Sequence, residues 1–222
     1  MNHSQRSFEL LQAGDLDALR LLLDETPAAA EAKDATGVSL LMHTLYHGRR
    51  DLAESIASKK HRLGIFEAAS LGRLDTLEEC LRNAAAALNS YSPDGFTALH
   101  FACYFGQAEA ARLLIEKGAK VDVVANNATH VMPLHSAASA RNLAATRLLV
   151  EHGAAVNARQ QGGWIPIHAA AQNGDRDMVE LLLAHGADPQ IANDDGKTAA
   201  MVAKDKGHTQ IAVLLEAQKA KS

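Results

Sequence analysis

The chain has 222 residues, of which 47% are hydrophobic and only 4% aromatic, and 26 acidic residues against 22 Lys and Arg give it a formal net charge of −4. The basic residues are interleaved with acidic ones and form no stripe, which argues against a nucleic-acid-binding protein. A core so poor in aromatic rings must consist mainly of Ala and Leu, so the few aromatic residues are informative by position.

Neither a secretory leader nor a membrane span is expected from the sequence. Residues 1–17 contain no apolar stretch, and no run approaches the roughly 18 apolar residues that a bilayer-spanning helix needs. Cys80 and Cys103 fall in the apolar helical patterns of different segments, so we expect two buried free thiols rather than a disulfide. We therefore expect a cytoplasmic, monomeric protein with no cofactor, no metal ion, and no membrane or nucleic-acid partner.

The first three predicted units cover about residues 5–25, 37–58 and 63–83, and each has two short helical patterns separated by a glycine. Glycine can take the left-handed conformation that ends a helix. Gly48 lies 34 residues after Gly14, but Gly72 follows Gly48 by only 24, so about ten residues of connecting loop are missing before the third unit. The basic run at 59–62 stands in their place; it could meet an acidic partner, and a solvated connector is the plainer interpretation.

The next three units, at about residues 94–118, 129–153 and 162–186, repeat one pattern closely. GFTALH at 95–100 returns as HVMPLH at 130–135 and as GWIPIH at 163–168. His135 and His168 are 33 residues apart, and a fixed period of about 20 to 50 residues is typical of a solenoid. The seventh unit, at about 195–217, is more polar, which suits an end cap. The predicted helices are about 8 to 10 residues long, too short to persist alone in water, so stacking must stabilise them.

The units resemble ankyrin repeats, which carry G-x-T-P-L-H-x-A-A-x-x-G, a second helix, and then G-A-D-V-N. Residues 163–174 and 186–188 fit this pattern closely, and the likeness covers nearly all of residues 5–217. It implies an all-α repeat solenoid of about seven stacked helix-turn-helix units with short β-hairpin-type loops, in a single domain over residues 1–222. Arg141 departs from the pattern because it stands where other units have Gly, so we expect its turn to be altered or strained.

Three histidines, His100, His135 and His168, recur once per unit. Stacked helices lie about 8 to 10 Å apart, whereas zinc ligands lie about 2 Å from the ion, so these side chains cannot readily share a metal. The resemblance implies that each one fastens a loop to a helix. The sequence contains no Gly-rich phosphate loop, no HExxH and no nucleophile elbow, and we predict no catalytic residue.

The resemblance also implies partner binding on the concave face, beside the start and at the end of each first helix. The partner-binding residues expected from it are Tyr46, Leu71, Phe96, Tyr104, Phe105, Val131, Trp164, Gln172 and Asn173. Five of these are aromatic, in a chain with few aromatic residues, and aromatic side chains are favoured as interface hot spots. We hypothesise that the five form a docking patch; the alternative is that some pack under the loops of their own repeat. Phe66 and Phe101 are assigned to the core.

The leading functional interpretation is a non-catalytic protein–protein interaction module, an adaptor or an inhibitor, that binds a protein or peptide through these exposed aromatic residues. The alternatives are an accessory or regulatory component of an enzyme, a cryptic hydrolase, or a structural spacer. The segment 95–121 carries Phe96, Tyr104 and Phe105 in one unit, so we place the expected binding centre there.

Overall fold

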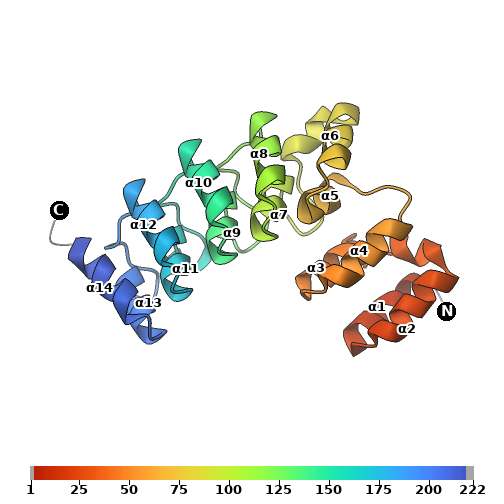
Figure 1. Ribbon diagram of the computed structural model, residues 1–222, viewed down its shortest axis with the longest axis horizontal. Helices are drawn as coiled ribbons and strands as arrows, with labels where there is room; N and C mark the ends of the chain where they lie inside the picture. Colours follow the sequence, from red (N-terminus) through yellow and green to blue (C-terminus); the bar gives the residue numbers. More distant parts are fainter. Residues whose placement is uncertain (1–2, 219–222) are drawn as a thin grey trace.

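The computed structural model describes residues 3–218; residues 1–2 and 219–222, which the expected domain span includes, lie outside the described part. The described residues form α-helices in consecutive pairs, with three short 3-10 helices and no strand (Figure 1). No helix within residues 3–218 is both long enough and apolar enough to cross a bilayer. The helices are α1 His3–Ala13, α2 Leu16–Glu25, α3 Leu40–Tyr46, α4 Arg50–Lys59, α5 Ile65–Leu71, α6 Leu74–Asn83, α7 Ala98–Tyr104, α8 Ala108–Glu116, α9 Pro133–Ser139, α10 Leu143–Glu151, α11 Pro166–Gln172, α12 Arg176–Ala184, α13 Ala199–Asp205 and α14 Thr209–Gln218, with η1 Pro27–Glu31, η2 Ala85–Asn89 and η3 Gln161–Gly163.

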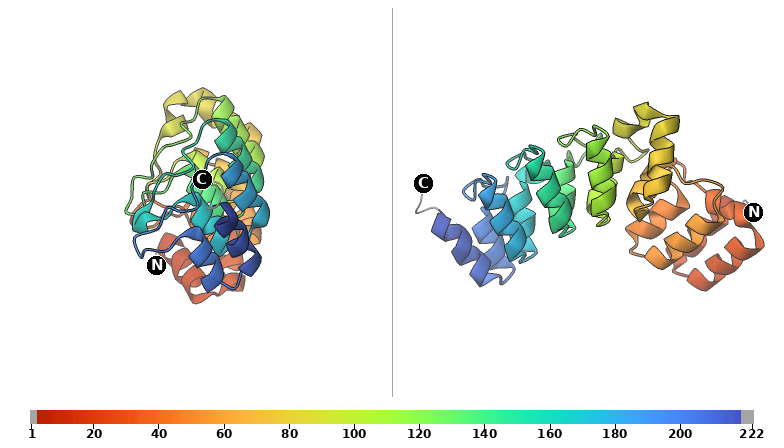
Figure 2. Two further views of the ribbon diagram at one scale, coloured as in Figure 1. Left: turned by 90° about the vertical axis from the view of Figure 1, so that its left-hand side faces the viewer. Right: turned by 45° about the horizontal axis from the view of Figure 1, so that its top comes forward.

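The helix pairs stack into an elongated arch (Figure 1). α5 and α6 lie at its top, and both ends of the chain lie lower; α7, α9 and α11, the first helices of their pairs, line the lower, inner side. The end-on view shows the connecting loops gathered on one side of the helices (Figure 2). The all-α repeat solenoid expected from the sequence is therefore confirmed.

Leucine and alanine form most of the core, as the composition predicts. Leu19, Leu52, Leu99 and Leu149 are fully buried, and alanines fill the closest approaches between helices. Of the two cysteines, Cys103 is buried as expected, whereas Cys80 is only half-buried, with its thiol directed at the carbonyl of Leu63. Both are free thiols.

The loops before the first helices, which we call fingers, comprise residues 33–39, 91–97, 125–131, 160–164 and 193–197. Each finger is closed by a backbone bond such as Ser92 N–H to the Phe96 carbonyl, 2.8 Å. Within the described residues the only pairing of strand type is an isolated bridge between Lys33 and Ser39, so the fingers are tight turns rather than hairpins of paired strands. The last four fingers are also bonded to one another: Asn126 N–H to Gly95 O, Gln161 N–H to Thr129 O and Asp194 N–H to Gly162 O, at 2.8, 2.9 and 2.9 Å.

The recurring histidines fasten each of three units to the loop that follows, as the resemblance implies. Each imidazole Nδ1 accepts from the backbone amide three residues before it, and each Nε2–H donates to a carbonyl of the following loop, which fixes the tautomer. The second bonds are His100 to Val131, 3.1 Å, His135 to Ala158, 3.0 Å, and His168 to Lys197, 3.1 Å. Burial lowers the pKa of all three, that of His100 to about 4.

The turn at Arg141 is strained, as its departure from the repeat pattern predicts. Arg141 has φ 57°, in the left-handed region that Gly48 occupies at the same turn of the second unit with φ 69°. A side chain at such a backbone conformation brings its Cβ close to the following carbonyl oxygen. The turn therefore keeps the backbone conformation of the other units, and Arg141 is held in a strained left-handed conformation.

The junction between α4 and α5 has no finger, as the shortened spacing predicts. α4 ends at Lys59 and α5 begins at Ile65. The fingers 33–39 and 91–97 therefore meet directly: Pro93 Cγ would lie 3.4 Å from a β-carbon placed on Gly37. In the later fingers, the residue at the position of Pro93 donates its backbone N–H to the preceding finger. Proline has no backbone N–H, so no donor is left unpaired where that preceding finger is absent.

Ion pairs tie this junction together in place of a finger. Lys60 Nζ lies 2.8 Å from a Glu31 carboxylate oxygen and 3.4 Å from Glu67, and Ser39 donates to Glu67 at 2.6 Å. Lys59 is paired with Asp24 and Arg62 with Glu79. The basic run at 59–62 is thus engaged inside the chain, which argues against its meeting an acidic partner.

Candidate partner-binding site

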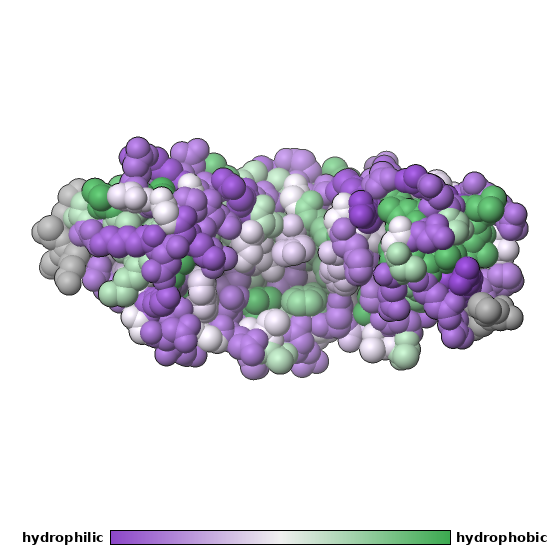
Figure 3. All heavy atoms as spheres, turned by 90° about the horizontal axis from the view of Figure 1, so that it is seen from below, coloured by the Kyte–Doolittle hydropathy of each residue, from purple (hydrophilic) through white to green (hydrophobic). Residues whose placement is uncertain are grey.

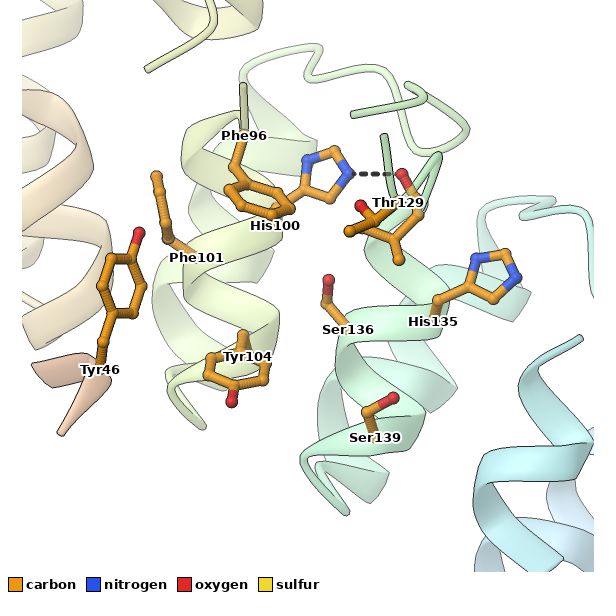
Figure 4. A pocket seen from close by; sticks show the side chains of 10 residues that line it. Tyr46, Phe96, His100, Phe101, Tyr104, Thr129, His135, Ser136 and Ser139 are labelled. Atoms are coloured by element: carbon orange, nitrogen blue, oxygen red, sulfur yellow. Dashed lines mark hydrogen bonds between the residues drawn. The ribbon is translucent and has the colours of Figure 1, made fainter. Parts of the chain in front are cut away.

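A hollow of about 330 Å³ opens between α3, α7 and α9 on the inner side of the arch. Figure 3 views this side and shows pale and green residues in its middle, bordered by purple, hydrophilic ones. Figure 4 shows Tyr46 beside Phe101 of α7, Tyr104 lower on α7, and Ser136 and Ser139 on α9. The residues that line it are Tyr46, Phe96, His100, Phe101, Tyr104, Thr129, Val131, His135, Ser136 and Ser139.

The rings of the site form one connected group. Tyr46 stacks on Phe105 with centroids 6.1 Å apart, and Phe105 stacks on Phe101 at 6.4 Å. Phe96 and Tyr104 meet this row edge-on, Phe96 against Phe101 at 5.7 Å and Tyr104 against Phe105 at 5.2 Å. Such edge and offset geometries are favourable for aromatic pairs, so the group holds its own shape.

Tyr46 belongs to the second unit, yet it contacts the fourth, because the missing finger lets these two units approach each other. Its hydroxyl donates to the Asp94 carboxylate in finger 91–97. Burial raises the pKa of the Tyr46 phenol, and the bond to Asp94 raises it further. The tyrosine therefore stays protonated and is held in place as one wall of the hollow.

Four of the nine expected partner-binding residues line the hollow: Tyr46, Phe96, Tyr104 and Val131. Tyr104 and Tyr46 are the most accessible of these, with 51% and 40% of their surface exposed, and Phe96 and Val131 are half-buried. Phe105 does not line the hollow; it is half-buried and supports the Tyr46 and Tyr104 rings from behind.

The expectation that Leu71 faces a partner is wrong, because only 4% of its surface is exposed. Leu71 ends α5 and belongs to the hydrophobic core, and Arg50 of α4 donates to its carbonyl at 3.1 Å. The residues at the same repeat position in the next three units, Phe105, Ala140 and Asn173, are half-buried, so this position is more covered in the third unit.

The remaining expected residues lie further along the arch, on and beside α11. Trp164 is half-buried, with its ring 5.5 Å from that of His168, and Gln172 is exposed. Asn173 is half-buried, and its side-chain amide donates to the carbonyls of Ala138 and Ser139, both at 3.3 Å. Asn173 therefore braces α11 against the end of α9. None of the three lines the hollow.

Several residues of the hollow were not among those expected from the sequence. Phe101, assigned to the core, is 3% exposed and still forms part of the floor. His100 and His135 also line the hollow while their nitrogens hold the loops. Thr129, Ser136 and Ser139 form the polar side. Ser139 is different, because it sits two residues before the glycine-equivalent turn, the same repeat position as Tyr104, so the resemblance does imply a partner-facing site there.

The lining of the hollow carries no fixed charge. Its lining contains no Lys, Arg, Asp or Glu, and burial lowers the pKa of its two histidines, so their rings are neutral. Within the described residues, no group of three or more His, Cys, Asp or Glu is placed to hold a metal ion. The arrangement can bind a side chain by ring contacts and by hydrogen bonds to hydroxyls.

A second, larger hollow of about 650 Å³ lies at the α4–α5 junction, between the fingers 33–39 and 91–97. Its polar side chains are occupied with each other, since Glu67 accepts from Ser39 and from the Gly64 amide and also pairs with Lys60. The space lies where a regular unit would carry a finger; its Lys60 and Arg62 are paired with carboxylates, whereas Asp94 lines it without an ion pair among residues 3–218.

Comparison with known proteins supports the resemblance seen in the repeats. The profile of the family described as ankyrin repeats (3 copies) matches residues 65–160 and 134–221. Similar curated proteins include the human BCL-6 corepressor-like protein 1, 37% identical over 39% of this chain, the Neurospora crassa ankyrin repeat protein nuc-2, 28% over 68%, and the human DNA-binding protein RFXANK, 30% over 50%. The alignments cover 5%, 15% and 43% of those relatives' own lengths.

Proposed function

This chain belongs to the ankyrin-repeat family, and we propose that it is a non-catalytic adaptor or inhibitor that holds a protein or peptide segment in the hollow between α3, α7 and α9. Ankyrin repeats are protein–protein interaction modules, and the family is in general not catalytic. The observation that carries the proposal is the exposed ring surface of Tyr104 and Tyr46 on the inner side of the arch.

The energetic case rests on how much ring surface is left open. Tyr104 is 51% exposed, in a chain whose other large side chains are mostly packed. An aromatic side chain buries about 150 to 250 Å², so covering half of one removes roughly 100 Å² from water. At about 25 cal/mol per Å² that is roughly 2 to 3 kcal/mol, the size of a hot-spot contribution.

The test compares two exposed tyrosines. Tyr104→Ala removes a wall of the hollow; Tyr91→Ala removes a ring that is 43% exposed on finger 91–97 but does not line the hollow. Partners captured from lysate by the wild-type chain are expected to be lost with Tyr104→Ala and kept with Tyr91→Ala, with both variants folded by circular dichroism. Equal capture by Tyr104→Ala and the wild type would sink the proposal.

Trp164 and Gln172 extend the proposed surface along α11. A longer partner segment lying along the inner side of the arch would reach them after filling the hollow. Substitution of Trp164 by Ala is accordingly expected to weaken capture less than Tyr104→Ala. A larger effect at Trp164 would move the centre of the proposed surface to α11.

The proposal includes a monomer that needs no cofactor and binds no nucleic acid. One relative is named a DNA-binding protein, which is said of that protein; this chain has a net charge of −4 and basic residues without a stripe. We expect no retardation of duplex DNA at moderate salt. Salt-dependent retardation would contradict this part of the proposal.

A further inference from the structure

We infer that the partner segment places an arginine side chain in the hollow between α3, α7 and α9. The inference rests on the proposed function, because it names what the proposed site takes. It is argued from the charge around the hollow, from its rings, and from its free oxygen atoms.

The lining repels no cation. None of its ten residues is Lys or Arg, and His100 and His135, with 1% and 3% of their surface exposed, each donate Nε2–H to a loop carbonyl as neutral rings. The basic side chain nearest in sequence to the α9 rim is Arg141, whose Nε lies 3.7 Å from an Asp175 carboxylate oxygen. The lining itself therefore presents no fixed positive charge to a group that enters the hollow.

A carboxylate without a cation lies directly behind the Tyr46 wall. Asp94 is half-buried and accepts hydrogen bonds from the hydroxyls of Tyr46 and Ser92, but within residues 3–218 it forms no ion pair. A partly desolvated carboxylate attracts a cation more strongly than one in open water. Asp94 lines the neighbouring hollow at the α4–α5 junction and reaches this one only through the Tyr46 hydroxyl, and its negative charge favours a basic side chain over an acidic one beside Tyr46.

The rings and hydroxyls favour arginine among the basic and apolar side chains. Tyr46 and Tyr104 present ring surface toward the hollow, and a planar guanidinium stacks on such rings (Figure 4). The hydroxyls of Tyr104, Ser136 and Ser139 make no hydrogen bond within the described part of the chain, so they can accept from the guanidinium fork. An apolar side chain would cover these oxygens without bonding them, and a lysine ammonium is a point charge that cannot stack.

The size of the hollow fits one extended side chain. Its volume of about 330 Å³ lies at the lower end of the usual range for ligand pockets, about 300 to 1,000 Å³. It therefore takes a single long side chain from a partner segment that runs across its mouth, rather than a packed helix.

The test uses four matched peptides, acetyl-Ala-Ala-Xaa-Ala-Ala-amide, with Arg, citrulline, Lys or norleucine at Xaa. Citrulline keeps the shape of arginine and lacks its charge. Binding is followed by the amide NMR signals of residues 104, 136 and 139 in the full ¹⁵N-labelled chain. The arginine peptide is expected to shift these signals with an affinity about fivefold above the citrulline peptide.

The outcomes separate the inference from the proposed function. If the citrulline, lysine or norleucine peptide shifts the same signals at equal or lower concentration than the arginine peptide, the choice of arginine is wrong, while the hollow remains a docking site. If no peptide shifts them, arginine docking is overturned, and the Tyr104 and Tyr91 comparison still decides the proposed function.

A second measurement isolates the carboxylate. Asp94→Asn keeps an acceptor for the Tyr46 hydroxyl and removes the charge, so it is expected to weaken the arginine peptide several-fold and leave the norleucine peptide unchanged. Asp195→Asn, on the distant finger 193–197, is the matched control. Unchanged binding of the arginine peptide to Asp94→Asn would overturn the part assigned to Asp94.

Discussion

Lowering the pH from 7 to 5 should destabilise this solenoid through its buried histidines. Burial lowers the pKa of His100 from 6.5 to about 4, so the folded chain binds a proton less readily than the unfolded chain. The stabilisation is fully present above about pH 6.5 and is lost as the pH falls toward 4, because the unfolded state is protonated first. With these two pKa values, the free energy of unfolding falls by roughly 2 kcal/mol between pH 7 and pH 5 from His100 alone.

His135 and His168 act in the same direction, since burial lowers their pKa as well. The assay is urea unfolding at pH 7, 6 and 5, compared between the wild-type chain and His100→Gln. Glutamine does not titrate, so the variant is expected to be less stable at pH 7 but to lose less stability on acidification. The difference between the two pH dependences should be about 2 kcal/mol over this range.

Two results would refute the reasoning. One is a His100→Gln variant whose stability falls with pH as steeply as that of the wild type. The other is an NMR titration in which the His100 imidazole of the folded chain titrates near 6.5, because burial would then not be favouring the neutral ring.

Three further substitutions test the fold itself. Arg141→Gly should raise the free energy of unfolding by about 1 kcal/mol by relieving a left-handed non-glycine residue, and Gly48→Arg at the equivalent turn should lower it, as urea midpoints would show; no change in either would contradict the strain. Lys60→Met should lower the free energy of unfolding by about 3 kcal/mol, because it leaves the Glu67 carboxylate, 9% exposed, without its cation. Hydrogen exchange should then rise first in α1–α4, and adding Glu67→Gln should recover most of the lost stability. Leu114→Ala, at a fully buried position, should cost about 2 to 5 kcal/mol in thermal or urea unfolding, and a loss below 1 kcal/mol would mean that α8 is not packed as described.

Much of this architecture can be predicted from the sequence because a repeat encodes its structure locally. The glycine spacing, the short amphipathic patterns and the recurring histidine each act within one unit or between neighbours. The sequence therefore predicts the seven helix pairs, the alanine and leucine core and the absent finger. The strained turn at Arg141 was predictable for the same reason, since a single substitution in a fixed pattern identifies it.

The candidate site depends on contacts between units that are not neighbours, and these only the tertiary structure decides. Where the finger is missing, the second unit approaches the fourth, so Tyr46 reaches Asp94 and Phe105, and Leu71 is buried instead of exposed. The physical reason is that a repeat pattern specifies how one unit packs on the next, whereas the approach of units two apart depends on how all the side chains at the α4–α5 junction pack at once.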